Sequence, residues 1–87
     1  MIDLELNFEA IFRVSAAHRL VQVRSRSRAG ILSGTFWDHE EYDAAGRLVA
    51  RYQSFEERDP HGGNRRSGWR KYDTIGRLVA EGDLPPT

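Results

Sequence analysis

The amino-acid sequence predicts an all-β fold, an antiparallel meander of about six strands in a single sheet or a partly curled barrel. Three observations support this prediction. A nine-residue hairpin motif occurs twice, the first residues alternate between apolar and polar types, and glycine-containing turns separate the later apolar segments. The 87 residues form a single domain with a thin core. Such chains often gain stability by dimerising or by extending a sheet.

Residues 1–30 are expected to supply the N-terminal strands. From Ile2 to Val14, apolar residues occupy every second position, which is typical of a half-buried strand. The same segment also carries a stripe at helical spacing, made of Leu4, Phe8, Ile11 and Phe12. A helix is therefore the alternative, although the β-branched and aromatic content favours the strand. Residues 20–25 can form a second strand, followed by a polar turn.

The repeated motif runs from Tyr42 to Ala50 and again from Tyr72 to Ala80, with seven of its nine positions identical. In each copy an aspartate opens the turn, where its side chain can accept a backbone amide. A glycine then takes the left-handed conformation that a bulged turn requires. The motif predicts two hairpins, at 31–58 and 68–83. A loop at 59–67 joins them, and a tail at 84–87 should fray or lie extended.

The predicted register sorts the side chains onto two faces. It places Tyr42 opposite Leu48, Glu41 opposite Val49, and His39 opposite Arg51. One face then carries Tyr42, Leu48, Ala50, Tyr52, Tyr72, Leu78 and Ala80. Of these, Tyr42, Leu48, Tyr72 and Leu78 are expected to be mostly buried. The other face carries the candidate protein-binding residues Trp37, Phe55, Trp69 and Val79. A single layer cannot hide both faces, so the N-terminal segment or a partner should cover one.

The hairpin motif is similar to known repeat families. Tyr-Asp-x-x-Gly-Arg-Leu resembles the core of the YD (RHS) repeats of large bacterial secreted toxins. The wider pattern from Gly68 to Gly82 resembles the bacterial MORN-repeat variant, with a degenerate first copy that begins at Gly34. The resemblance covers residues 34–82. It implies antiparallel hairpins and a scaffold or binding role, and it brings no catalytic residues.

Composition excludes several function classes. Thirteen bases balance thirteen acids, so no global field attracts nucleic acid or anionic lipid. The chain has no cysteine, which excludes disulfides and thiolate chemistry and favours a cytoplasmic location. No basic leader opens the sequence, and no apolar run is long enough to span a bilayer, so we expect no membrane partner.

The densest group of possible ligands and acids runs from Trp37 to Glu41. On a strand only His39, Glu41 and Asp43 would share a face, so at most three groups could converge on a metal. A solvated acidic strand is the simpler interpretation. No spacing suggests a catalytic triad or a nucleophile elbow. We therefore expect no enzyme activity, no cofactor and no metal.

The leading hypothesis is a small non-catalytic protein-interaction module that acts through a sheet edge or the tryptophan face. It would bind a partner protein or itself, a homodimer being the simplest case. The alternative is a nucleic-acid-associated regulatory protein that uses two basic clusters. Their members are Arg24, Arg26, Arg28, Arg65, Arg66, Arg70 and Lys71. Bases at alternate strand positions share a face and could hold phosphates, but they could equally protect an edge from aggregation.

Overall fold

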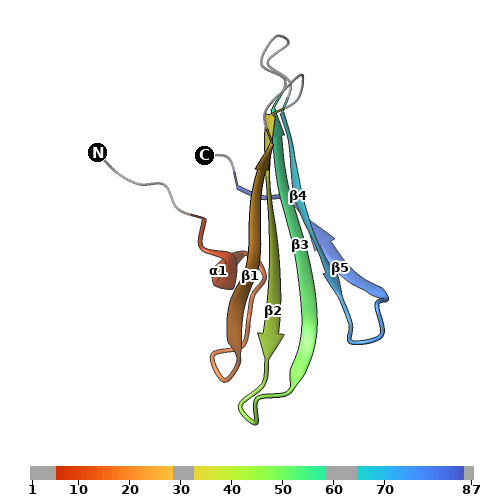
Figure 1. The fold of residues 1–87 in the computed structure, drawn as a ribbon. Helices are drawn as coiled ribbons and strands as arrows, with labels where there is room; N and C mark the ends of the chain where they lie inside the picture. The colour runs from red at the N-terminus through yellow and green to blue at the C-terminus, as the bar shows by residue number, and fades with distance from the viewer. Residues whose placement is uncertain (1–5, 29–32, 59–64, 86–87) are drawn as a thin grey trace, which may run out of the picture.

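A computed structural model describes residues 6–28, 33–58 and 65–85. It confirms an all-β antiparallel meander, with five strands in the described residues rather than about six (Figure 1). The strands are β1 (Arg19–Arg28), β2 (Ser33–Tyr42), β3 (Leu48–Arg58), β4 (Arg65–Tyr72) and β5 (Leu78–Gly82). They follow one another in a single open sheet, which leaves β1 and β5 at its two edges.

Residues 6–14 do not form the strand that alternation predicted for the N-terminal segment, whose first five residues lie outside the described part of the chain. They contain a short helix, α1 (Phe8–Ile11), which the side chain of Asn7 caps by accepting the amide of Ala10 at 3.2 Å. Arg13 then takes a left-handed φ of 55° and ends the helix. Four residues cannot sustain a helix by themselves, so contact with the sheet must stabilise it. The helical stripe therefore decides the local structure of the described part of this segment.

Both hairpins have the predicted bulged turn. In the first, the Asp43 amide donates to the Arg47 carbonyl at 2.9 Å, and the Gly46 amide donates to the Asp43 carbonyl at 3.0 Å. The Asp43 carboxylate also accepts the amides of Ala45 and Arg47. Gly46 has a φ of 81°, and its counterpart Gly76 has a φ of 89°. The second turn repeats the same backbone bonds.

The register next to each turn differs from the prediction. Tyr42 does pair with Leu48, but the next residue, Glu41, pairs with Ala50 and leaves Val49 as an extra residue. The second hairpin skips Val79 in the same way. One extra residue in a strand reverses the face to which each later side chain of that strand points. Consequently His39 lies opposite Tyr52 and not Arg51. The predicted division of side chains between the faces was therefore wrong for Ala50, Tyr52 and Phe55 of β3.

The core lies between α1 and one face of the sheet. Its buried members are Phe12, Ala50 and Tyr52, and half-buried Phe8, Ile11, Val14, Leu20 and Trp69 pack around them. Leu78 was expected to be buried, but it is 48% exposed, because its pairing with Tyr72 places it on the face that α1 does not cover and because β5 is a short edge strand.

The expected loop and tail also need correction. Residues 65–67 belong to β4, and residues 59–64 lie outside the described part of the chain. The tail does not simply fray, because Leu84 is only 4% exposed. In Figure 1 the segment after β5 turns back toward the side of the sheet where α1 lies. The described part of the C-terminal segment therefore adds to the covered side.

We expect Gly46→Val to lower the free energy of unfolding by more than about 1 kcal/mol, because a β-branched residue is strained at positive φ. No atom lies within 4 Å of an added Cβ at this position, so the cost is conformational and not steric. Urea denaturation should show a smaller loss for Gly46→Asn, since asparagine tolerates this conformation. Equal stability of the valine variant and the wild type would contradict the bulged turn.

Gly82→Ala should also destabilise the chain, by about 1–3 kcal/mol. The new Cβ would lie 2.9 Å from the Cζ2 and Nε1 atoms of Trp69, which is the cross-strand partner of Gly82. Trp69 cannot easily move away, because Phe12 packs edge-on against it. Alanine is otherwise no worse than glycine in a strand, so a loss would identify the steric conflict. The exposed neighbour Glu81→Ala is the control, and an unchanged melting temperature for Gly82→Ala would refute this contact.

Candidate functional site

The tryptophan face is covered by the chain's own helix. Trp37 and Trp69 do lie on the same face, as predicted. Phe8 of α1 contacts the Trp37 ring with 5.3 Å between centroids, and Phe12 contacts Trp69 at the same distance. Both indoles are half-buried. This face therefore has an intramolecular partner that the expected N-terminal strand could not have supplied.

The other two residues of the predicted protein-binding group do not join the tryptophans. Phe55 pairs with Phe36 on one side and Gly68 on the other, which places it on the opposite face. Val79 is the extra residue of the second hairpin and is 54% exposed. The bulges explain both corrections, because they shift β3 and β5 by one position relative to a regular ladder.

A polar cluster lies on the covered face beside the aromatic core. Glu41, only 5% exposed, accepts a hydrogen bond from the Tyr52 hydroxyl at 2.5 Å. Its other carboxylate oxygen lies 2.5 Å from Nδ1 of His18. The pairing of β3 with β4 puts Lys71 next to Tyr52, with its ammonium 5.7 Å from the phenol ring centre. Four segments of the chain thus meet at one buried carboxylate.

The electrostatics of this cluster favour an ionised Glu41. Burial alone would raise its pKa, but hydrogen bonds from His18 and Tyr52 and the charge of Lys71 outweigh burial and hold the pKa below its ordinary value of 4.5. Burial, together with the bond to Glu41, raises the pKa of Tyr52 far above its usual range. Glu41 therefore acts as an ionised hydrogen-bond acceptor and Tyr52 as a neutral donor, which ties β2 to β3 inside the core.

His39 lies under the same helix. Its ring centroid is 4.4 Å from that of Phe8, and burial lowers its pKa despite the nearby charge of Asp38. Nδ1 of His39 is buried without a hydrogen-bond partner in the described structure. His39 and Glu41 share a face, as the sequence suggested. Within residues 6–28, 33–58 and 65–85, however, no three histidine or acidic side chains are arranged to hold a metal.

The predicted nucleic-acid residues are divided between the two faces. Arg65 bonds to Glu56 at 3.2 Å on the α1 side, where Lys71 also lies. Arg24, Arg26, Arg66 and Arg70 belong to the opposite, open face by their strand pairing. Arg28 ends β1, and its side chain lies outside the described structure. The two basic clusters predicted from the sequence therefore do not lie on one surface as a whole. Four of their arginines, two from β1 and two from β4, do share the open face.

No element covers the open face in the described part of the chain. This face contains a hollow of about 260 Å³ lined by Arg26, Arg66 and Arg70 with Phe36, Phe55 and Gln53. A neighbouring hollow of about 290 Å³ is lined from β1 by Val23 and from the β4–β5 hairpin by Tyr72 and Gly76. Because widely separated strands line one depression, the open face is concave.

The two edges of the sheet differ in length and charge. β1 has ten residues, including four arginines and no acid, and β5 has five residues, including Glu81. Arg24 makes a long ion-pair contact with Asp38, at 3.9 Å. Val21 and Val23 on β1 are exposed by 37% and 54%. A bulge between Gln22 and Arg24 interrupts the pairing of β1 with β2. Among the strands of residues 6–28, 33–58 and 65–85, β1 is thus a long, basic edge strand with no neighbour on its outer side.

No family model, curated protein or solved structure matches this chain. The resemblance to MORN-type and YD repeats therefore rests on the hairpin motif residues alone. The helix α1 has only four residues, which is far too few to cross a membrane. The described residues contain no helix that is longer than α1.

Glu41→Gln should reduce stability at neutral pH by about 1–2 kcal/mol, because the buried ionic hydrogen bonds are lost. The folded pKa of Glu41 lies below its unfolded value, so its contribution is complete above that unfolded value and disappears as pH falls through the folded pKa. Urea denaturation should therefore show a gap between wild type and variant that is widest near neutral pH and closes in acid. Glu40→Gln, which breaks a more exposed pair with Arg51, should have a smaller effect. A gap that persists unchanged in acid would contradict this assignment.

Proposed function

We propose that the chain is a small non-catalytic protein-interaction module that acts through the edge of its sheet. The observation that carries this proposal is the ten-residue edge strand β1, which among the described strands pairs only with β2. An edge strand presents a row of unpaired backbone groups, and an extended segment of another chain can add to it as a further strand. The hairpin-repeat resemblance is consistent with a binding role.

The positive charge of β1 indicates that its partner is negatively charged. Four arginines without an acid favour an extended segment rich in glutamate or aspartate. Two β1 strands side by side would oppose like charges, whereas the other edge, β5, carries Glu81. Self-association therefore remains part of the proposal as pairing of β1 with β5 of a second copy. The two tryptophans have a structural role in this module, because Phe8 and Phe12 already pack on their face of the sheet.

The cysteine-free composition supports a cytoplasmic location as part of the same proposal. A non-catalytic role fits two members of the buried carboxylate cluster, because the pKa of Glu41 is lowered and the pKa of Tyr52 is raised, both away from neutral pH. The proposed module thus works by backbone pairing and charge, with no chemical step.

A short peptide of alternating valine and glutamate should protect the β1 amides from hydrogen exchange. A matched peptide of valine and lysine should not. The variants Val21→Pro and Gln22→Pro provide the internal control, because successive residues direct their amides to opposite sides of a strand. One proline removes an amide that faces β2 and should unfold the edge. The other should leave the fold intact and abolish peptide protection.

Light scattering of the wild type over a range of concentrations tests self-association separately. Growth in mass that the fold-preserving proline variant prevents would identify a second copy as the partner. A monomer that also ignores the acidic peptide would reject the proposed edge.

A further inference from the structure

The centre of the open face carries two phenylalanines directly opposite each other, Phe36 on β2 and Phe55 on β3. The tip of the Phe55 ring, Cζ, lies 3.3 Å from the position that a Cβ would take at Gly68 on β4. A ring standing upright would hold its tip well above the neighbouring strand. The Phe55 ring therefore leans across the sheet, over a position that only glycine leaves empty.

Phe36 is placed in a comparable way. Its Cε2 atom lies 3.3 Å from the Cβ position of Gly34, two residues away on the same strand. Both rings are half-buried, and a ring that lies along a surface turns one flat side outward. The two glycines thus let both rings lie along the centre of the open face, where the Arg66 guanidinium lies over the Phe55 ring. Flat aromatic faces are the surfaces on which other planar groups stack.

Arginines surround this aromatic pair. Arg26 lies beside Phe36 in the β1–β2 pairing, and the Arg66 guanidinium carbon is 5.8 Å from the Phe55 ring centre. Arg70 lines the same hollow. In the described part of the chain neither Arg26 nor Arg70 has an ion-pair partner. Asp38 and Glu57 also line the hollow, so three bases against two acids leave it weakly positive.

We propose that the open face binds single-stranded nucleic acid, with bases stacked on Phe36 and Phe55 and phosphates held by Arg26, Arg66 and Arg70. The combination of flat rings and nearby guanidinium groups decides the class of ligand. An acidic peptide would use the arginines but leave the ring faces without planar partners. A duplex would expose phosphates while hiding its base faces inside the stack. An unpaired strand satisfies both features, as on other sheet surfaces that bind single strands.

The charge balance sets the expected strength and salt dependence. The whole chain has no net charge, so attraction must come from the local arginines. If three phosphates are neutralised, the logarithm of the binding constant should fall with the logarithm of salt concentration with a slope of about −2. The two acids in the hollow restrict binding to modest affinity, on the order of micromolar to tens of micromolar at low salt.

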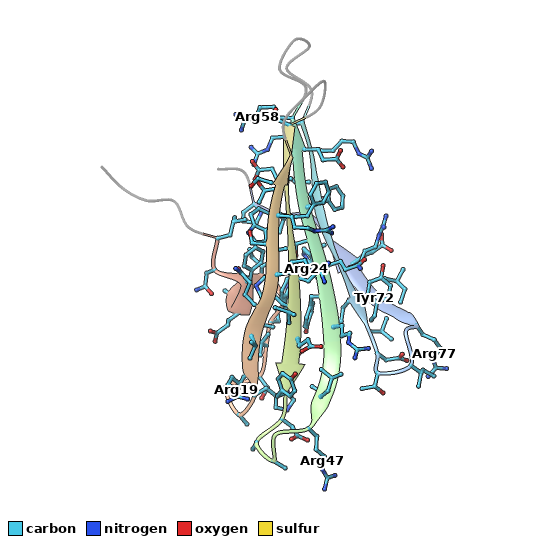
Figure 2. All side chains as sticks on the ribbon, viewed as in Figure 1. Arg19, Arg24, Arg47, Arg58, Tyr72 and Arg77 are labelled. Atoms are coloured by element: carbon cyan, nitrogen blue, oxygen red, sulfur yellow. The ribbon has the colours of Figure 1, made fainter. Side chains whose placement is uncertain are left out.

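The test measures fluorescence anisotropy of labelled oligo-dT and oligo-rU, each about 12 nucleotides long, with the intact chain at several salt concentrations. Phe55→Leu keeps an apolar residue but removes the ring, and it should weaken binding about fivefold or more. Arg70→Gln is an exposed change that should not disturb folding, and it should reduce the salt slope by about 0.7. Arg47→Gln is the matched control, because Arg47 projects from the tip of the first hairpin (Figure 2).

Several outcomes would overturn the proposal. These are no binding at low salt, equal binding of a duplex of the same sequence, or a Phe55→Leu variant and an Arg70→Gln variant that both bind like the wild type. A polyglutamate peptide that competes at equal concentration of charge would assign the arginines to acidic proteins instead. The edge proposal is tested with prolines in β1 that do not touch this hollow. Either proposal can therefore fail without the other.

Discussion

The stacking of Phe12 on Tyr52 is the contact on which the rest of the structure depends. Their ring centroids are 4.0 Å apart and their planes differ by only 9°. Phe12 follows a helix too short to persist alone, and Tyr52 lies at the middle of the central strand. Together they cover part of one face of the sheet, which is the only layer of strands in the described residues. In a domain of this size one buried aromatic pair accounts for a large part of the free energy of unfolding.

This contact also explains the buried polar cluster. The Tyr52 hydroxyl lies in the interior and needs a partner, and Glu41 supplies it. The carboxylate in turn is satisfied by His18, from the segment that links α1 to β1. Helix, linker and central strands are therefore joined by one aromatic stack and one buried acid. A loss at either site should loosen the same part of the molecule, so the two contributions are not expected to be additive.

Covering one face leaves the other free for function. The chain has too few apolar residues to cover both faces, and the open face instead combines glycines, two phenylalanines and arginines. The curvature of the sheet gathers these residues into adjoining hollows. The long β1 edge adds a second exposed surface of a different kind, defined by backbone groups. The proposed protein and nucleic-acid surfaces thus follow from the same imbalance between the two sides of one layer.

The sequence by itself determined the hairpins, because their aspartates, glycines and backbone bonds act within a few residues of one another. It therefore predicted the meander, the positive φ of Gly46 and Gly76, and the shared face of Trp37 and Trp69. Only the tertiary structure decided the rest. The bulges at Val49 and Val79 reverse the side-chain alternation and move Phe55 to the open face. The N-terminal segment fits strand and helix periods alike, and it becomes a helix because its aromatic rings meet Tyr52, His39 and Trp69 from distant strands.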